Sequence, residues 1–192
     1  QIPRNIFFNL KQEVQFFNNF TDDELLLFLR LMQTQTFSEG ATIFKEFDPG
    51  NTMFILFRGT VEVRKRIGKK AGVTQETTIA TLKSGECFGE IGLIDSRPRS
   101  ASAIAIEDVL LFSISLDKLL KIARNPKFAI LSFKLFRNFS IMLATRLRET
   151  NQKVVDLTVK FSGPNSGFDP PEITAEASDI PEGPSDATLE DE

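Results

Sequence analysis

The stretch that decides the fold is FGEIGLIDSRPRSAS, which occupies positions 88–102 of the 192-residue chain. It places a carboxylate, Glu90, nine residues before a guanidinium, Arg99, with glycines in front and small residues behind. Arg99 can bind two phosphate oxygens at once, and Glu90 can accept hydrogen bonds from sugar hydroxyls. The small side chains at 100–102 would let backbone N–H groups close on an anion. The stretch therefore fits a cyclic phosphodiester carried on a ribose.

This run resembles the phosphate-binding cassette of cyclic-nucleotide-binding domains. The family pattern is Phe-Gly-Glu-(Leu/Ile)-(Ala/Gly)-Leu, a variable loop, and then Pro-Arg, a small residue, Ala and a hydroxyl residue; each position holds a permitted type here. We call residues 88–102 the cassette. The resemblance implies that Glu90 binds the ribose 2′-hydroxyl and that Arg99 binds the cyclic phosphate. The ligand-binding residues expected within the cassette are Phe88, Gly89, Glu90, Ile91, Arg99, Ser100 and Ala101.

Two further residues bear on the choice of base. In the transcription activators of this family, a Thr-Ser pair at the end of the dimer helix touches the adenine amino group. Residues 147–157 resemble that helix end, with Thr150 in the place of the threonine and Asn151 in the place of the serine. An asparagine oxygen can still accept from an amino group. Ser100 does not discriminate, because a hydroxyl residue stands there in members of either preference. We expect cAMP as the first choice of ligand and cGMP as the second.

The region from 36 to 115 has the rhythm of short strands separated by turns. Residues 52–57 are nearly continuously apolar, as in a strand packed from both sides, and Val61 and Val63 alternate with charged residues. Turn signals fall at 38–40, 48–51, 58–59, 68–72 and 83–85. This pattern predicts a mainly β protein with flanking helices, built on an antiparallel β-roll of the jelly-roll type.

Helical patterns lie on either side of the predicted roll. Thr21 and Glu24 form a capping box ahead of an apolar run, which places a helix in the N-terminal segment. After a short helix that ends near Arg124, Asn125 and Pro126 start a long one. Its apolar residues cover two sides, whereas a surface helix needs only one. We therefore expect a homodimer through this helix, with deeper burial inside one subunit as the alternative.

The predicted organisation has four parts. Residues 1–35 form N-terminal helices, 36–115 the β-roll with the cassette, and 116–160 the C-terminal helices that cover the ligand. Residues 161–192 form an acidic tail, which we expect to be disordered because it combines nine acids and five prolines with few large apolar groups. A helix-turn-helix domain should begin here in the activators, and this tail cannot supply one, so we expect no DNA binding within this chain.

Composition excludes several kinds of enzyme. The chain has no histidine, which excludes catalytic triads and histidine zinc sites. Gly68-Lys69-Lys70 lacks the upstream glycine and the following Ser or Thr of a P-loop. All 23 basic residues precede residue 161, against 17 acidic ones, so the body of the chain is positive and favours anionic ligands. We expect no catalytic residue, no metal and no cofactor other than the nucleotide ligand.

The segment 128–147 is the best candidate for a membrane span, and Lys134 and Arg137 interrupt it. A leader peptide is not recognisable, and the single cysteine, Cys87, fits a reducing compartment. The sequence therefore predicts a cytoplasmic location without membrane contact. Since the chain begins at Gln1, we expect that something was removed or that the sequence is a fragment.

These observations favour a cyclic-nucleotide-binding signalling module whose long helix moves when ligand binds and acts on an unknown downstream protein. Two alternatives remain. One is an interaction scaffold of the same fold that binds no nucleotide. The other is a fragment of a cyclic-nucleotide-dependent transcription regulator whose DNA-binding part lies outside this sequence.

Overall fold

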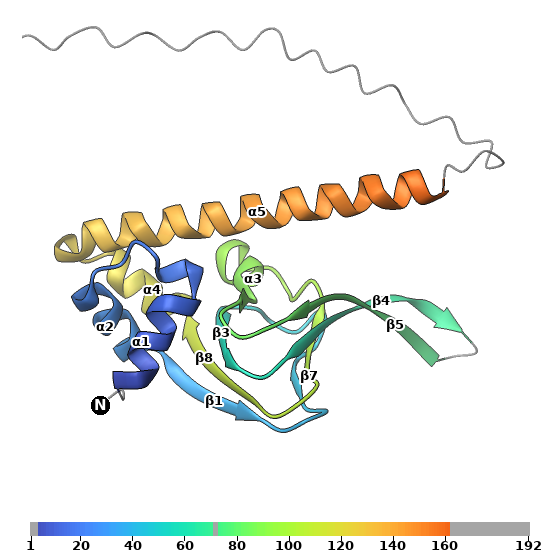
Figure 1. Ribbon diagram of the computed structural model, residues 1–192, viewed down its shortest axis with the longest axis horizontal. Helices are drawn as coiled ribbons and strands as arrows, with labels where there is room; N and C mark the ends of the chain where they lie inside the picture. The colour runs from blue at the N-terminus through green and yellow to red at the C-terminus, as the bar shows by residue number, and fades with distance from the viewer. Residues whose placement is uncertain (1–3, 71–72, 162–192) are drawn as a thin grey trace, which may run out of the picture. The chain divides into compact units, whose positions relative to one another are not determined.

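The computed structural model describes residues 4–70 and 73–161, and the following description concerns these residues. Their strands form two antiparallel four-stranded sheets, ordered β1-β8-β3-β6 and β2-β7-β4-β5 (Figure 1). The strands are β1 (Gln33–Phe37), β2 (Thr42–Phe44), β3 (Thr52–Arg58), β4 (Val61–Lys70), β5 (Val73–Leu82), β6 (Cys87–Phe88), β7 (Ser102–Ala105) and β8 (Val109–Ser115). The predicted antiparallel β-roll with flanking helices is confirmed.

Helices precede, interrupt and follow the strands. They are α1 (Arg4–Glu13), the 3₁₀ turn η1 (Gln15–Phe17), α2 (Asp22–Leu31), α3 (Glu90–Asp95), α4 (Leu116–Ala123), η2 (Pro126–Phe128) and α5 (Ala129–Phe161). The predicted capping box is present, since the Thr21 hydroxyl accepts from Glu24 N and the Glu24 carboxylate accepts from Thr21 N. Asn125 caps the next start by accepting from Lys127 N. The predicted boundary at residue 36 falls inside β1, which begins at Gln33.

The chain divides into two compact units, residues 1–145 and 146–192, and α5 runs from the first into the second. The first unit holds both sheets, the cassette and the other helices. In the second unit the described residues are 146–161, a continuous stretch of helix. The predicted acidic tail lies outside the described residues apart from its first residue.

Strand β3 separates two hydrophobic cores. Met53 and Ile55 are fully buried among the residues of α1, α2, α4 and α5. Phe54 and Leu56 point to the opposite face, into the core between the two sheets. Alternation along a strand sends neighbouring side chains to opposite faces. Strand β3 is therefore packed on both faces, against the helices on one and inside the roll on the other, as the nearly continuous apolar run predicted.

The β4–β5 hairpin is longer than its turn signals suggest. A turn was predicted over 68–72, but β4 continues to Lys70 and pairs with β5 from there down to Val61 and Leu82. The register shifts between Arg66 and Gly68, so the hairpin absorbs that glycine as an irregularity inside a strand. The turn prediction was too long because a glycine within a strand carries the same signal as a glycine in a turn.

Gly59 closes the β3–β4 turn at a place that only glycine fits. Its φ of +96° lies in the left-handed region, and a Cβ there would stand 2.7 Å from Asp108 O and 2.7 Å from Val109 Cγ1. This close approach holds the β3–β4 turn against the start of β8.

The first part of α5 packs on the helical core of its own unit. Leu131, Leu135 and Phe139 are buried, Lys134 Nζ lies 2.7 Å from Glu24 Oε2, and Asn138 donates to the carbonyl oxygen of Phe16 at 2.7 Å. The segment Pro126–Lys160 is nevertheless long and apolar enough to cross a membrane by length and composition, which is weak evidence because core helices meet the same test. Lys134 and Arg137 alone therefore do not exclude a membrane span.

Candidate functional site

The cassette begins with a backbone turn that requires glycine. Gly89 sits between β6 and α3 with φ +77°, and it precedes the first residue of α3. A Cβ at this position would lie 2.8 Å from Arg99 Nη1 and 3.0 Å from Thr52 O. A Cβ here would force the Arg99 guanidinium or the backbone to shift, and the positive φ strains any side chain, so the turn favours glycine. Gly89 thus lets the guanidinium of Arg99 approach the start of α3.

Arg99 lies in a pocket of aromatic rings. Its side chain is 6% exposed, and Nη1 donates to Gly89 O at 2.9 Å. The guanidinium carbon stands 4.2 Å from the centre of the Phe44 ring and 5.8 Å from that of Phe54, distances that favour cation–π attraction. Burial lowers the pKa of Arg99, and the nearby charges of Asp48 and Glu90 oppose this shift. Arginine stays protonated even so.

Glu90 is the first residue of α3 and is 1% exposed. Its carboxylate acts electrostatically on Arg99, whose guanidinium is bonded to the residue just before it. The structure therefore brings the predicted carboxylate and guanidinium together, although nine residues separate them in sequence. A buried carboxylate beside a buried guanidinium is a costly arrangement unless each finds strong partners. Such pairs gather at functional sites more often than elsewhere.

The remaining predicted cassette residues play unequal parts in the structure. Phe88 is buried and stacks on Phe54, with ring centres 5.2 Å apart. Ala101 is buried, whereas the Ser100 side chain is exposed and the Ile91 side chain is 46% exposed. Phe88 and Ala101 thus support the cassette from the core, and Ile91 and Ser100 face solvent.

Thr150 and Asn151, the predicted base contacts, lie in the second unit. Both are exposed residues of α5. Their contact with an adenine stays a prediction.

A group of residues that the sequence did not single out holds the cassette from behind. The backbone of Arg99 is bonded to the loop between β2 and β3 on both sides: Phe47 N donates to Arg99 O at 2.9 Å, and Arg99 N donates to Asp48 O at 2.8 Å. Glu46, which precedes this loop, is 5% exposed and bonds to Lys65. Nothing in their spacing reveals this, because the residues are remote in sequence.

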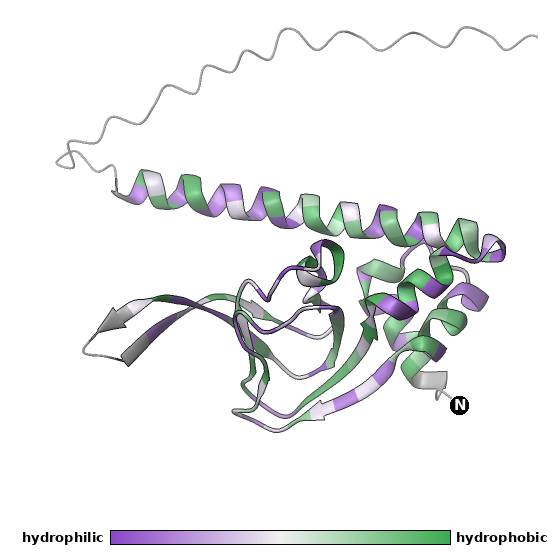
Figure 2. Ribbon diagram, turned by 180° about the vertical axis from the view of Figure 1, so that it is seen from behind, coloured by the Kyte–Doolittle hydropathy of each residue, from purple (hydrophilic) through white to green (hydrophobic). Residues whose placement is uncertain are grey.

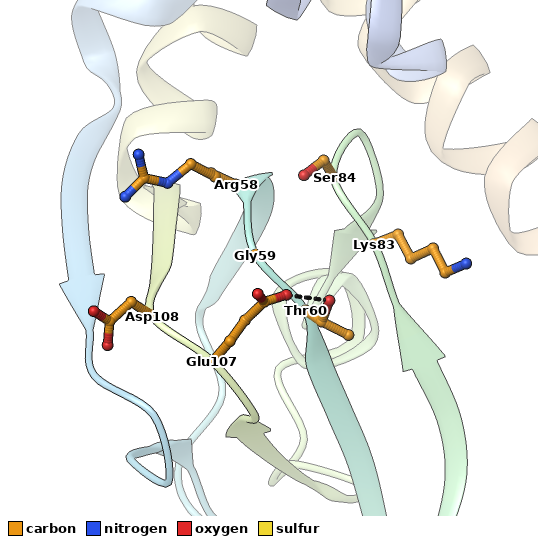
Figure 3. Close-up of a pocket in the computed structure, with 7 residues that line it drawn as sticks. All are labelled: Arg58, Gly59, Thr60, Lys83, Ser84, Glu107 and Asp108. Carbon is orange, nitrogen blue, oxygen red and sulfur yellow. Dashed lines mark hydrogen bonds between the residues drawn. The ribbon is translucent and has the colours of Figure 1, made fainter.

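The first unit also contains two hollows that include neither Glu90 nor Arg99. One, of about 560 Å³, lies where three turns meet, and Figure 3 shows its lining residues Arg58, Gly59, Thr60, Lys83, Ser84, Glu107 and Asp108. Glu107 accepts from the Thr60 hydroxyl at 2.5 Å, and Asp108 accepts from Glu39 N. Arg58 and Lys83 extend away from each other in the same view. Both carboxylates in the lining are thus already hydrogen-bonded to neighbouring turns, which gives them a structural role.

The second hollow, of about 310 Å³, is almost entirely apolar and lies between α3, α4 and the first part of α5. Leu93 and Ile94 line it from α3, and Leu135 and Phe139 line it from α5. Apolar side chains of the cassette helix and of α5 thus line the same hollow. Among the described residues no cluster of three or more cysteines or acids is placed to hold a metal ion.

Comparisons with known proteins agree with this geometry. Residues 34–125 match the family model described as a cyclic nucleotide-binding domain. This segment of the chain belongs to the cyclic nucleotide-binding domain family. The match begins within β1 and ends just after α4, so it takes in nearly all of the roll and the whole cassette.

Individual relatives extend the similarity. The chain is 35% identical over 137 residues to the cyclic AMP receptor protein of Thermus thermophilus, which covers 70% of this chain and 58% of that protein. It is 30% identical over 111 residues to a cAMP-dependent protein kinase regulatory subunit of Colletotrichum orbiculare, covering 58% of this chain and 27% of the relative. A solved cyclic nucleotide-binding domain from Methylobacillus flagellatus superposes with a TM-score of 0.68 at 26% identity, over 80% of this chain and 82% of that one. The chain thus spans little more than half the length of the first of these curated relatives, and much less of the second.

Proposed function

We propose that this chain is a regulatory domain that binds a cyclic nucleotide in the cassette, with Arg99 on the cyclic phosphate and Glu90 on the ribose. The observation that carries the proposal is the placement of a buried guanidinium against the N-terminal turn of α3, next to a buried carboxylate. Arg99 Nε has no hydrogen-bond partner among the described residues, so the guanidinium retains donor capacity for an anion. No catalytic step is assigned to the chain.

cAMP is the preferred ligand in this proposal, and cGMP is the alternative. Both curated relatives described above carry cAMP in their names. Thr150 would add a contact to the adenine amino group, as the family resemblance implies. The ligand would bind in the cytoplasm, because a chain with a single cysteine, Cys87, cannot form an internal disulfide and fits a reducing compartment.

The signal would pass from the cassette to α5. The short helix α3 carries both the proposed ligand-binding residue Glu90 and, about one turn later, Leu93, which lines the apolar hollow. A small shift of α3 on ligand binding would move Leu93 relative to Leu135 and Phe139, which line the same hollow. A ligand can bias α5 only if it binds the two arrangements with different affinity.

A homodimer through α5 is part of the same proposal. Within the first unit, the side chains of Ile130, Phe133, Phe136 and Ile141 are between 48% and 71% exposed. Figure 2 shows hydrophobic residues interleaved with hydrophilic ones along α5. Four large apolar side chains exposed on one helix favour burial against a partner, and a second copy presents the same stripe. A downstream protein would then read the position of α5.

One alternative is that this chain is a fragment of a longer, cyclic-nucleotide-dependent transcription regulator. The Thermus thermophilus relative extends well beyond the matched region, because the match covers 58% of its length. In that case the DNA-binding part lies outside this sequence, and the ligand and the cassette are unchanged. The other alternative, a scaffold that binds no nucleotide, is favoured only by the low exposure of Arg99 in this structure.

Absorbance of the purified protein gives a direct test. The chain contains no Trp and no Tyr, so it absorbs very little near 280 nm. A band near 260 nm that disappears on denaturation and dialysis would identify a bound purine nucleotide. Calorimetric titration of the stripped protein with cAMP and cGMP should then give saturable binding with cAMP favoured. Saturation by neither nucleotide would support the scaffold alternative.

A further inference from the structure

Behind the cassette lies a buried carboxylate that no ligand role accounts for. Glu46 is 5% exposed, yet both of its oxygens are bonded: Oε1 to Lys65 Nζ at 3.0 Å and Oε2 to Arg66 N at 3.0 Å. The hydrogen bond from Arg66 N, against the opposing effect of burial and with further help from Lys65, lowers the pKa of Glu46. The carboxylate is therefore charged at neutral pH and fixed in place from two directions.

Lys65 carries this network into the cassette. Its ammonium also donates to the carbonyl oxygen of Ser100 at 2.6 Å. At the other end, Glu46 N donates to the hydroxyl of Ser102, which is buried, at 3.0 Å. We call these bonds the Glu46–Lys65 network. It holds the residue just after Arg99 through the Lys65 ammonium and the residue that begins β7 through the Glu46 backbone, so both ends of the segment 100–102 are bonded to the same pair of residues.

The orientation of one peptide group follows from the bond to Ser100. The structure has no cis peptide bond among the described residues, so the Ser100–Ala101 peptide is trans. In a trans peptide the C=O and the N–H point in opposite directions. Because Lys65 holds the Ser100 oxygen, the N–H of Ala101 points away from Lys65. That N–H is one of the backbone donors that the cassette would offer to a phosphate.

The loop that follows Glu46 is held under strain. Phe47 has φ +73°, in the left-handed region that non-glycine residues seldom adopt, and it donates its N–H to Arg99 O. Such conformations persist only where surrounding bonds over-determine them. The residues on either side of Phe47 supply such bonds. Glu46 N donates to the Ser102 hydroxyl, and Asp48 O accepts from Arg99 N.

We propose that Glu46 and Lys65 are positioning residues for anion binding: they fix the Ser100–Ala101 peptide so that its N–H faces the phosphate held by Arg99. This rests on the proposed function. Neither residue touches the ligand. Lys65 is 48% exposed in its side chain, so its contribution comes from the bonds it makes to buried acceptors and not from its own burial.

Replacement of Lys65 by methionine keeps the length of the side chain and removes the donor. We expect Lys65→Met to weaken cAMP binding about tenfold, since a misaligned backbone N–H forfeits part of a hydrogen bond to a charged group. Lys65→Arg, which keeps a donor and a positive charge, should restore most of the affinity. Lys118→Met is the matched control, because Lys118 donates to the backbone carbonyl of Leu31 at 2.8 Å between α4 and the end of α2. Its affinity should stay within about twofold of wild type.

A double-mutant cycle separates positioning from general loss of stability. If Lys65 acts through the phosphate geometry, Lys65→Met should cost much less affinity in an Arg99→Lys background than in wild type. A structural effect alone would lower affinity equally in both backgrounds, and thermal unfolding of each variant measures that part. Equal losses in the two backgrounds, or unchanged affinity of Lys65→Met, would overturn the proposal. The wild-type titration separates failure of the positioning role from failure of the proposed function. If wild type binds cAMP saturably and Lys65→Met binds equally well, only the positioning role is refuted. If wild type does not bind a cyclic nucleotide, the proposed function is refuted as well.

Discussion

At the scale of the single residue, the site depends on two backbone positions of opposite character. Gly89 occupies a left-handed conformation that its lack of a side chain makes easy, and the space it leaves is taken by Arg99. Phe47 occupies the same region of conformational space with a large side chain, 65% exposed, whose ring lies under Arg66 at 5.5 Å. The first position is relaxed and the second is strained.

Substitutions at Phe47 measure that strain. Phe47→Gly and Phe47→Ala both remove the ring and its contact with Arg66, so they differ mainly in the backbone. We expect Phe47→Gly to be more stable than Phe47→Ala by about 1 kcal/mol, because a Cβ in the left-handed region costs roughly that amount. Thermal and urea unfolding give the difference. Equal stability of the two variants would mean that the loop relaxes and that Phe47 is not held as described.

Glu90 and Arg99 could be predicted from the sequence because both belong to one dense local motif, the cassette. Glu46 and Lys65 could not be predicted in this way, because they are 19 residues apart and Glu46 lies in the turn after β2 whereas Lys65 lies in β4. Glutamate and lysine are residue types that usually lie on the protein surface. Only the register of β4 against the loop before β3 makes them neighbours, and a single sequence does not encode that register in any local pattern.

At the scale of the element, α5 shows two faces in the first unit. Leu135 is 4% exposed in the helical core, whereas Phe133, two residues earlier, is 68% exposed. The two-sided apolar pattern was predicted from the sequence, and the structure distinguishes the side that packs within the subunit from the side that does not. Dimerisation through the second side stays a prediction.

The two faces should respond differently to truncation. Leu135→Ala should lower the free energy of unfolding by about 2–5 kcal/mol, the range for large-to-small changes in a core. Phe133→Ala should change the stability of the monomer by less than about 0.5 kcal/mol and should shift the equilibrium toward monomer. Urea unfolding and sedimentation measure the two quantities. An unchanged dimer fraction in Phe133→Ala would remove this side of α5 from the interface.

Among the strands, β3 and the start of β4 were predicted from their side-chain patterns, and β5 was not. Residues 73–82 include four threonines, one Gln and one Glu, and they show no clear alternation of apolar and polar residues. They form a strand because β4 offers a complete backbone ladder beside them. Pairing of this kind depends on tertiary context more than on side-chain pattern.

At the scale of the whole molecule, charge couples stability to pH. Hydrogen bonds hold the pKa of Glu46 below its usual value of 4.5. A carboxylate with a lowered pKa in the folded state contributes stability above its unfolded pKa and loses that contribution as pH falls through the folded value. The contribution of Glu46 should therefore be present at pH 7, begin to decline near pH 4.5 and be lost as the pH falls through the lower folded pKa.

Glu46→Gln isolates this effect. The amide cannot titrate, so the midpoint of thermal unfolding should fall less between pH 6 and pH 3.5 in the variant than in wild type. At neutral pH the variant should be the less stable protein, since it loses the charged bonds to Lys65 and Arg66. Parallel stability curves for the two proteins over this pH range would show that Glu46 is not charged and bonded as described.

The account as a whole depends on Arg99 as the anchor of a cyclic phosphate. The most direct test is calorimetric titration of cAMP into wild type, Arg99→Ala and Arg97→Ala. Arg97 is the matched control, because it lies two residues away with a side chain that is 83% exposed. We predict that Arg99→Ala weakens binding at least about 30-fold, whereas Arg97→Ala stays within about twofold of wild type. Binding by Arg99→Ala as tight as that of Arg97→Ala would contradict the account.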